Sequence, residues 1–154
     1  MPKKTLEQHV IRRGDFAPNL LNLGNDFWRA VGEAARDGIV GNVRAQQQHD
    51  GKPQKRNAPS TIAAKRRKGR KPLSLIDDPA HYRFGRKQNY FVRVLKTSVR
   101  VGPKAQDIVK YVLAAGYRGW LRPPVKYMAK KLHELVLAEV VKARRKARRK
   151  KRTV

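Results

Sequence analysis

The sequence predicts an α+β fold in which a long helix precedes a small antiparallel β-sheet and a second long helix follows it. Apolar residues recur every three or four positions early in the chain, alternate with other residues near position 90, and return to helical spacing after position 123. At 154 residues the chain is long enough for one domain with a modest core. We expect an N-terminal arm over residues 1–18, one α+β domain over residues 19–141, and a basic C-terminal tail over residues 142–154.

The first long helix is expected over residues 19–48, and Asp15 or Asn19 is a candidate for its N-cap. Four glycines, at positions 24, 32, 38 and 41, each weaken a helix by up to ~1 kcal/mol relative to alanine. They predict close packing against another helix or a neighbouring subunit, or a kink. The apolar stripe consists of Leu20, Leu23, Phe27, Val31, Ala34 and Ala35, widened by Trp28.

A basic segment, residues 49–72, follows this helix. Its first part is rich in turn-forming residues and predicts a loop, after which Ser60 is a candidate N-cap for a short helix over residues 61–68. The cluster around this helix resembles a nuclear localisation patch, but such motifs occur by chance in basic proteins. We expect it to contact a polyanion or an acidic partner through Lys65, Arg66, Arg67, Lys68, Arg70 and Lys71.

A β-pattern begins at Tyr82, where Tyr82 and Phe84 alternate with arginine. In the next segment Tyr90, Val92 and Val94 fall on one face of a strand, and the intervening residues fall on the other. A turn at residues 96–98 leads into a second strand over residues 99–101, which Gly102-Pro103 ends. The pattern predicts a hairpin.

Two further helices are expected, over residues 108–115 with Asp107 as cap and from Pro123-Pro124 onward. Between them, residues 116–120 form a loop with two aromatic residues prone to exposure. The last helix has a predicted buried stripe of Val125, Met128, Leu132, Leu135, Val136 and Val140. Like-charged pairs one turn apart in the tail predict that residues 142–152 fray alone and become ordered on an anionic partner.

The charge of the chain points to a negatively charged partner. Lysine and arginine total 38 against 11 acidic residues, a formal net charge of +27, and self-repulsion at that charge opposes compaction. The partner is nucleic acid or an acidic protein surface, and the absence of a zinc-finger, RNP or GXXG motif gives no sign of sequence readout. In the tail, the residues that we expect to contact this negatively charged partner are Arg144, Arg145, Arg148, Arg149, Lys150 and Lys151.

The sequence indicates no catalytic residue, metal ligand or cofactor site. It has no cysteine, no GxSxG elbow and no phosphate-binding glycine loop. The tightest cluster with ligand chemistry, residues 77–81 (DDPAH), is explained by turn formation before a proline. No apolar run reaches the length of a membrane span or a signal peptide. We therefore expect a soluble, non-enzymatic protein without a membrane partner.

From Asp50 onward the chain resembles the virion-morphogenesis, or tail-completion, family of long-tailed, Mu-like bacteriophages. The similar segments are Asp50-Gly51-Lys52-Pro53 after the first helix, Pro59-Ser60-Thr61 with Lys65-Arg66-Arg67, Leu73 to Leu75, Val99-Arg100-Val101-Gly102, and Tyr111 to Gly116 followed by Arg122-Pro123. The chain departs from the family pattern at three places. Gln54 stands where the family commonly has tryptophan, and Asp77-Asp78-Pro79 stands where threonine-glycine is expected. The histidine that the family has after Tyr111 is missing from its usual place. The order and spacing of the segments carry the resemblance.

The resemblance implies a structural subunit of a ring in the neck or at the head-proximal end of the tail, which completes the tail and joins it to the head. Its partners would be further copies of itself, the portal or connector, and the tail terminator or tube, with genomic DNA in the channel. The ring would belong to the virion and assemble in the cytoplasm of the bacterial host. We assign the subunit interface to Trp28, Tyr117, Trp120 and Arg122. The alternative function is a nucleic-acid-binding protein of the ribosomal or nucleoid type.

Overall fold

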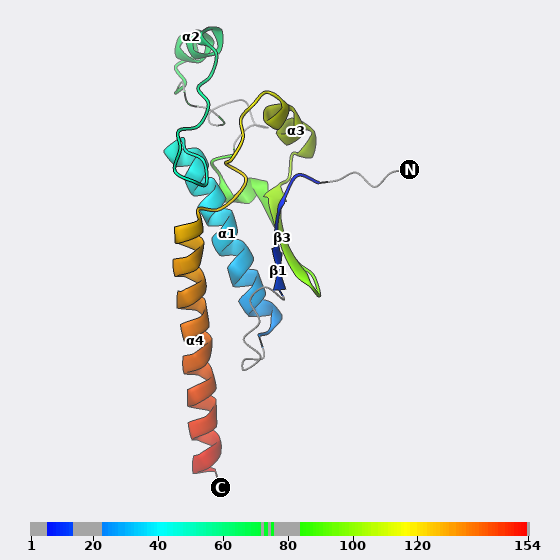
Figure 1. Ribbon diagram of the computed structural model, residues 1–154, viewed down its shortest axis with the longest axis vertical. Helices are drawn as coiled ribbons and strands as arrows, with labels where there is room; N and C mark the ends of the chain where they lie inside the picture. The colour runs from blue at the N-terminus through cyan, green and yellow to red at the C-terminus, as the bar shows by residue number, and fades with distance from the viewer. Residues whose placement is uncertain (1–5, 14–22, 72, 74, 76–83, 154) are drawn as a thin grey trace, which may run out of the picture.

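A computed structural model of the chain describes residues 6–13, 23–71, 73, 75 and 84–153, and it confirms the α+β fold (Figure 1). α1 lies between a small sheet on one side and α4 on the other. The elements in chain order are β1 (His9–Arg12), α1 (Asn25–Ala45), α2 (Pro59–Arg67), the short 3₁₀ helix η2 (Lys87–Asn89), β2 (Tyr90–Val94), β3 (Ser98–Pro103), α3 (Gln106–Ala114) and α4 (Val125–Arg152).

The predicted hairpin is confirmed as β2 and β3, which pair antiparallel with Val94 opposite Val99 and Val92 opposite Val101. Val99 and Val101 are fully buried and face α1, whereas Arg93 and Arg100 are exposed. The second strand is longer than expected because β3 continues through Gly102 to Pro103, which pairs with Tyr90. Tyr82 lies outside the described residues, and Phe84 is buried in a turn rather than in a strand.

Residues 9–12 belong to the sheet and not to a separate N-terminal arm, because they form β1, the third strand. The strand order is β1-β3-β2, with His9 opposite Val101 and Arg12 opposite Ser98. Only Ile11 of the four strand residues is buried. A strand this short, with one buried residue, has no alternation signal of its own, and it forms because the edge of β3 supplies backbone partners.

α1 carries the main core stripe, in which Val31, Ala35 and Ile39 have no exposed surface. The close packing predicted from its glycines occurs at two of the four positions. A Cβ on Gly32 would lie 2.5 Å from Val92 Cγ1, and a Cβ on Gly38 would lie 2.8 Å from Pro123 Cβ. These two glycines let the sheet and the start of α4 approach α1 from its two sides.

The helix ends differ from expectation for identifiable reasons. α1 begins at Asn25 with Gly24 as its N-cap, so it is capped by neither Asp15 nor Asn19, which lie outside the described residues. It ends three residues early because Gln46 adopts the left-handed conformation (φ 54°). α2 begins at Pro59, whose fixed φ suits a first turn, so Ala58 rather than Ser60 is the N-cap. In α3, Asp107 lies within the first turn, and Ala105 takes the cap position.

α4 runs without a break to Arg152, so the expected basic tail is helical and continuous with the domain (Figure 1). Alanine, lysine and arginine are strong helix formers, and cations interact favourably with a helix C-terminus. The predicted stripe is only half-buried: Met128, Leu132, Leu135 and Val136 pack against the core, whereas Val125 is 73% exposed. One helix, α1, is too narrow a partner to cover this stripe.

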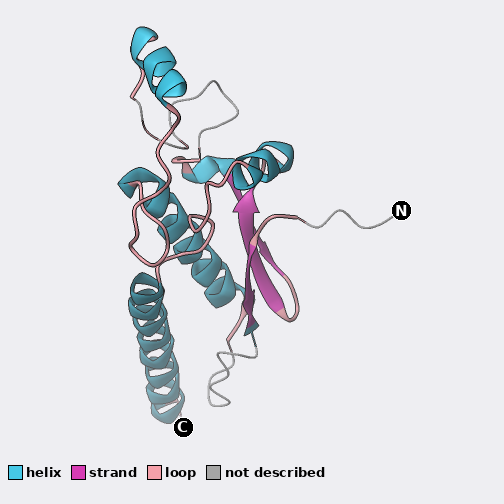
Figure 2. Cartoon of the chain, turned by 45° about the horizontal axis from the view of Figure 1, so that its top comes forward, coloured by secondary structure: helices cyan, strands magenta, loops and turns pink. Residues whose placement is uncertain are grey.

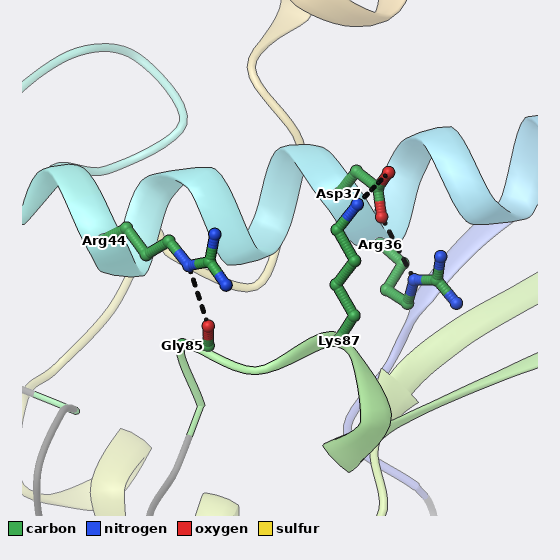
Figure 3. A network of polar contacts seen from close by, with 5 residues as sticks. All are labelled: Arg36, Asp37, Arg44, Gly85 and Lys87. Atoms are coloured by element: carbon green, nitrogen blue, oxygen red, sulfur yellow. Dashed lines mark hydrogen bonds and ion pairs between the residues drawn. The ribbon is translucent and has the colours of Figure 1, made fainter.

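The segment before β2 is fastened to α1 by polar contacts (Figure 3). The Arg44 Nε–H donates to the Gly85 carbonyl oxygen at 2.9 Å. Asp37 accepts from Lys87 Nζ at 2.8 Å through Oδ2 and from Arg36 Nε at 3.1 Å through Oδ1. Asp37 therefore offsets positive charge at Arg36 and Lys87, where the segment before β2 meets α1.

Candidate polyanion-binding surfaces

The first cationic cluster lies on α2 and the turn that follows it, away from the sheet (Figure 1). Arg66, Arg67, Lys68 and Lys71 are exposed, and Arg70 is half-exposed. No described carboxylate forms an ion pair with these five residues. As far as the described residues go, these five cations are available to an anionic partner.

The assignment of Lys65 to the same cluster is wrong. Its side chain is 5% exposed, and its Nζ donates to the Leu73 carbonyl oxygen at 2.8 Å. Asn57 Nδ2 donates to the same carbonyl at 3.1 Å. Lys65 therefore holds residue 73 against α2, and its positive charge serves the fold rather than an outside ligand.

The second cluster occupies the last three turns of α4. We call residues 142–152 the α4 extension. Every residue from Val141 to Thr153 is exposed, including the six assigned to anion contacts. At the end of the helix, the Thr153 hydroxyl donates to the carbonyl oxygens of Arg149 at 3.2 Å and Lys150 at 3.1 Å.

The structure does not bring the two clusters together. α2 and the C-terminus of α4 lie at opposite ends of the long axis (Figure 1), and the separation persists in the second view (Figure 2). They therefore form two separate surfaces rather than one basic patch. A single small anion cannot contact both.

Two of the four residues assigned to a subunit interface belong to the core of the protomer. Trp120 has no exposed surface, packs against Phe84 with ring centroids 5.0 Å apart, and donates from Nε1 to the Tyr117 carbonyl at 3.0 Å. Trp28 is 3% exposed and forms a T-shaped contact with Phe27, with ring centroids 5.1 Å apart. The interface assignment is wrong for both, because neither ring offers free surface.

The other two residues remain accessible. Tyr117 is half-buried, and its hydroxyl donates to Asn57 Oδ1 at 2.9 Å, which links the loop after α3 to the segment before α2. Arg122 is exposed beside a surface hollow of about 590 Å³, whose lining includes Glu7, His9 and His49. Their place in an interface stays a prediction.

Asn42 is a structural residue that the sequence did not single out. It is fully buried in α1, and its Nδ2 donates to the carbonyl oxygens of Arg122 at 2.5 Å and Trp120 at 3.3 Å. These bonds fix the loop that leads into α4 and thereby set where the extension points. An asparagine on the otherwise apolar stripe between Ile39 and Val43 was the available signal.

His9 lies in the hollow beside Arg122. Burial, and secondly the nearby Arg122 charge, lower the pKa of His9 below its usual value. The folded protein therefore binds a proton at His9 less readily than the unfolded chain does. Stability from this residue is present above the ordinary histidine pKa and is lost as the pH falls towards the lowered folded value.

We expect the free energy of unfolding to decrease between pH 7.5 and pH 5, and His9→Gln to reduce that decrease. Urea denaturation followed by circular dichroism at the two pH values measures both. His133→Gln, at an exposed position of α4, is the control. An equal effect of the two substitutions would contradict the role of His9.

Within the described ranges, no three histidine or acidic side chains come close enough to hold a metal ion. The cluster at residues 77–81 lies outside those ranges. No helix in the described part of the chain is both long enough and apolar enough to cross a membrane.

Comparison of the chain with models of known protein families, with curated proteins and with solved structures gives no match. A functional proposal for this chain therefore depends on its own residues.

Proposed function

We propose that the protein is a structural subunit of a tailed bacteriophage, which forms a ring in the neck or at the head-proximal end of the tail and joins head to tail. The observation that carries the proposal is the order of the segments in which the chain resembles tail-completion proteins. Asp50-Gly51 lies in the loop after α1, and the basic segment contains α2. β3 includes Val99 to Gly102, and Arg122-Pro123 leads into α4. The protein acts through contact and performs no chemistry.

The exposed apolar residues support a ring. Closed rings use two different surfaces of each subunit, because each subunit meets one neighbour on either side. In the described part of the chain, the large exposed apolar residues fall on two regions. The first is α4, and the second is β1, the β2–β3 turn and α3. The residues are Val125, Leu137 and Val141 in the first region, and Val10, Leu95 and Tyr111 in the second. Leu137 and Val141 are one turn apart, on the side of α4 turned away from α1.

The charge distribution fits the same role. A ring whose lumen displayed every lysine and arginine would bind DNA with steep salt dependence and retain it during ejection. We therefore assign most of the basic residues, including the α2 cluster, to acidic surfaces of the connector or tail proteins. The separation of α2 from the end of α4 lets one subunit reach two partners at once.

Electron microscopy of the purified protein tests the proposal directly, and the expected result is closed rings of uniform size. A phage lacking this protein should accumulate separate heads and tails. Protein that never forms rings, together with a deficient phage that still yields joined virions, would overturn the proposal.

We expect Leu137→Asp to abolish ring formation, because it places a charge in the apolar contact between neighbouring subunits. Sedimentation velocity and micrographs of the variant report the loss. Ala129→Asp adds the same charge at another exposed position of α4 and should leave the rings intact. Rings formed equally well by both variants would exclude Leu137 from the interface.

A further inference from the structure

The α4 extension projects beyond the body of the protein. Gly24–Phe27, at the start of α1, line one hollow together with Glu139 and Lys142. The extension therefore begins beside the N-terminal end of α1, beyond which α1 no longer covers α4. It continues for about 16 Å, at 1.5 Å per residue. All of its side chains are exposed.

Cations surround the extension instead of forming one face. Successive residues of a helix are turned by about 100° around its axis, so the basic positions leave open only the strip occupied by Ala143 and Ala147. No acidic residue interrupts them, and no described carboxylate forms an ion pair with residues 144–152. The basic residues are Lys142, Arg144, Arg145, Lys146, Arg148, Arg149, Lys150, Lys151 and Arg152.

The distribution around the helix discriminates among negatively charged partners. An acidic protein surface meets one side of a helix and leaves the charges on the far side unneutralised. Insertion of a helix into the surface of an anionic membrane requires an apolar face, and residues 142–152 include no large apolar side chain. A groove with anionic walls on both sides matches cations on both flanks.

We propose that the α4 extension binds duplex DNA by lying in the major groove, with its flanks against the phosphates of both strands. The major groove of B-form DNA is about 12 Å wide and admits an α-helix, and the two alanines allow close approach on the open strip. The corresponding groove of an RNA duplex is too narrow and deep for side chains to read. The extension has no aromatic residue to stack on single-stranded bases.

Phosphate neutralisation also stabilises the helix itself. Arg144 and Arg148, and likewise Arg145 and Arg149, are like-charged pairs one turn apart that repel one another in the free protein. Binding to DNA removes that repulsion. The proposal is independent of ring formation, since a single copy of the chain carries the whole extension.

Fluorescence anisotropy with the full-length protein and a labelled, mixed-sequence duplex of about 20 base pairs tests the proposal across a range of salt concentrations. The test variant replaces Arg144, Arg145, Arg148 and Arg149 by glutamine. Loss of four phosphate contacts should reduce the slope of log affinity against log salt concentration by about 3 to 4, at roughly 0.9 per contact. Circular dichroism verifies that the variant keeps its helix content.

The matched control removes the same charge from α2 by replacing Arg66, Arg67, Lys68 and Lys71 with glutamine, and it should leave the slope nearly unchanged. An equal reduction in both variants would show that binding follows net charge, and would overturn the assignment to the extension. Polyglutamate serves as a probe for an acidic protein partner. If it binds as tightly as DNA and loses affinity equally in the test variant, the proposal of a DNA partner fails.

A second duplex tests the groove. Its cytosines carry glucosylated hydroxymethyl groups, which fill the major groove and leave the phosphates in place. On this duplex we expect the wild-type protein and the four-glutamine variant to bind with nearly the same affinity, because the four arginines can no longer enter the major groove. Unchanged binding would overturn the major-groove placement, and micrographs of the same samples report ring formation separately.

Discussion

Replacing Trp120 with alanine is expected to lower the free energy of unfolding by about 3–5 kcal/mol, the largest effect of any single change we predict. The ring has no exposed surface, contacts Phe84, and donates its indole N–H to the Tyr117 carbonyl. Truncation leaves a cavity between the loop after α3 and the segment before β2. Urea denaturation of the purified protein, followed by intrinsic fluorescence and circular dichroism, measures the loss.

Tyr111→Ala is the matched control for stability, since Tyr111 is 69% exposed on α3. Exposed substitutions of this kind change stability by about 0.5 kcal/mol or less. The comparison also decides whether Trp120 belongs to the core of the protomer or to the subunit interface. A variant that folds with wild-type stability and fails only to associate would restore the interface assignment and contradict the burial seen here.

Gly32→Ala is expected to destabilise the protein by about 1–3 kcal/mol, although alanine is the better helix former. Its Cβ would lie 2.5 Å from Val92 Cγ1 and 2.7 Å from Val99 Cγ1, so α1 must move away from the sheet. Both valines belong to the packed layer between α1 and the hairpin. Thermal unfolding monitored by circular dichroism measures the effect.

The control lies in the same helix. A Cβ on Gly41 would have no neighbour within 4 Å, so Gly41→Ala should raise the free energy of unfolding by up to ~1 kcal/mol through helix propensity alone. Opposite signs for the two substitutions are the expected result. Stabilisation by both would mean that α1 lies farther from the sheet than these distances indicate.

Periodicity predicted the elements whose residues pack along a continuous face. The stripe of α1 and the alternation in β2 and β3 arise from neighbours close in sequence, so the pattern is visible before the chain folds. Gly32 and Gly38 also indicated close packing, although the sequence did not reveal which element approaches each one. The prediction that the apolar stripe of α4 is buried was only partly right. Periodicity shows which face of a helix is apolar, but it does not show how much of that face a partner covers.

Contacts between distant residues were not predictable. β1 has one buried residue, Ile11, and depends on a strand that begins at Ser98. Trp120 stands among glycine and arginine, a context typical of an exposed loop, and only its packing against Phe84 reveals a core position. The burial of Lys65 depends on a carbonyl at residue 73 that no local pattern indicates.

The pairing of β1 with β3 also governs the order in which the protein folds during synthesis. His9 pairs with Val101, 92 positions later, so the N-terminal segment leaves the ribosome long before its partner has been made. Until then the backbone groups of β1 have no partner in the chain. Once β3 has been made, its edge stays open until β1 pairs with it, and such an edge pairs readily with a strand from another molecule. Closure by β1 thus ends the period in which neighbouring nascent chains can exchange strands, and a bulky fusion placed before residue 9 would prolong it.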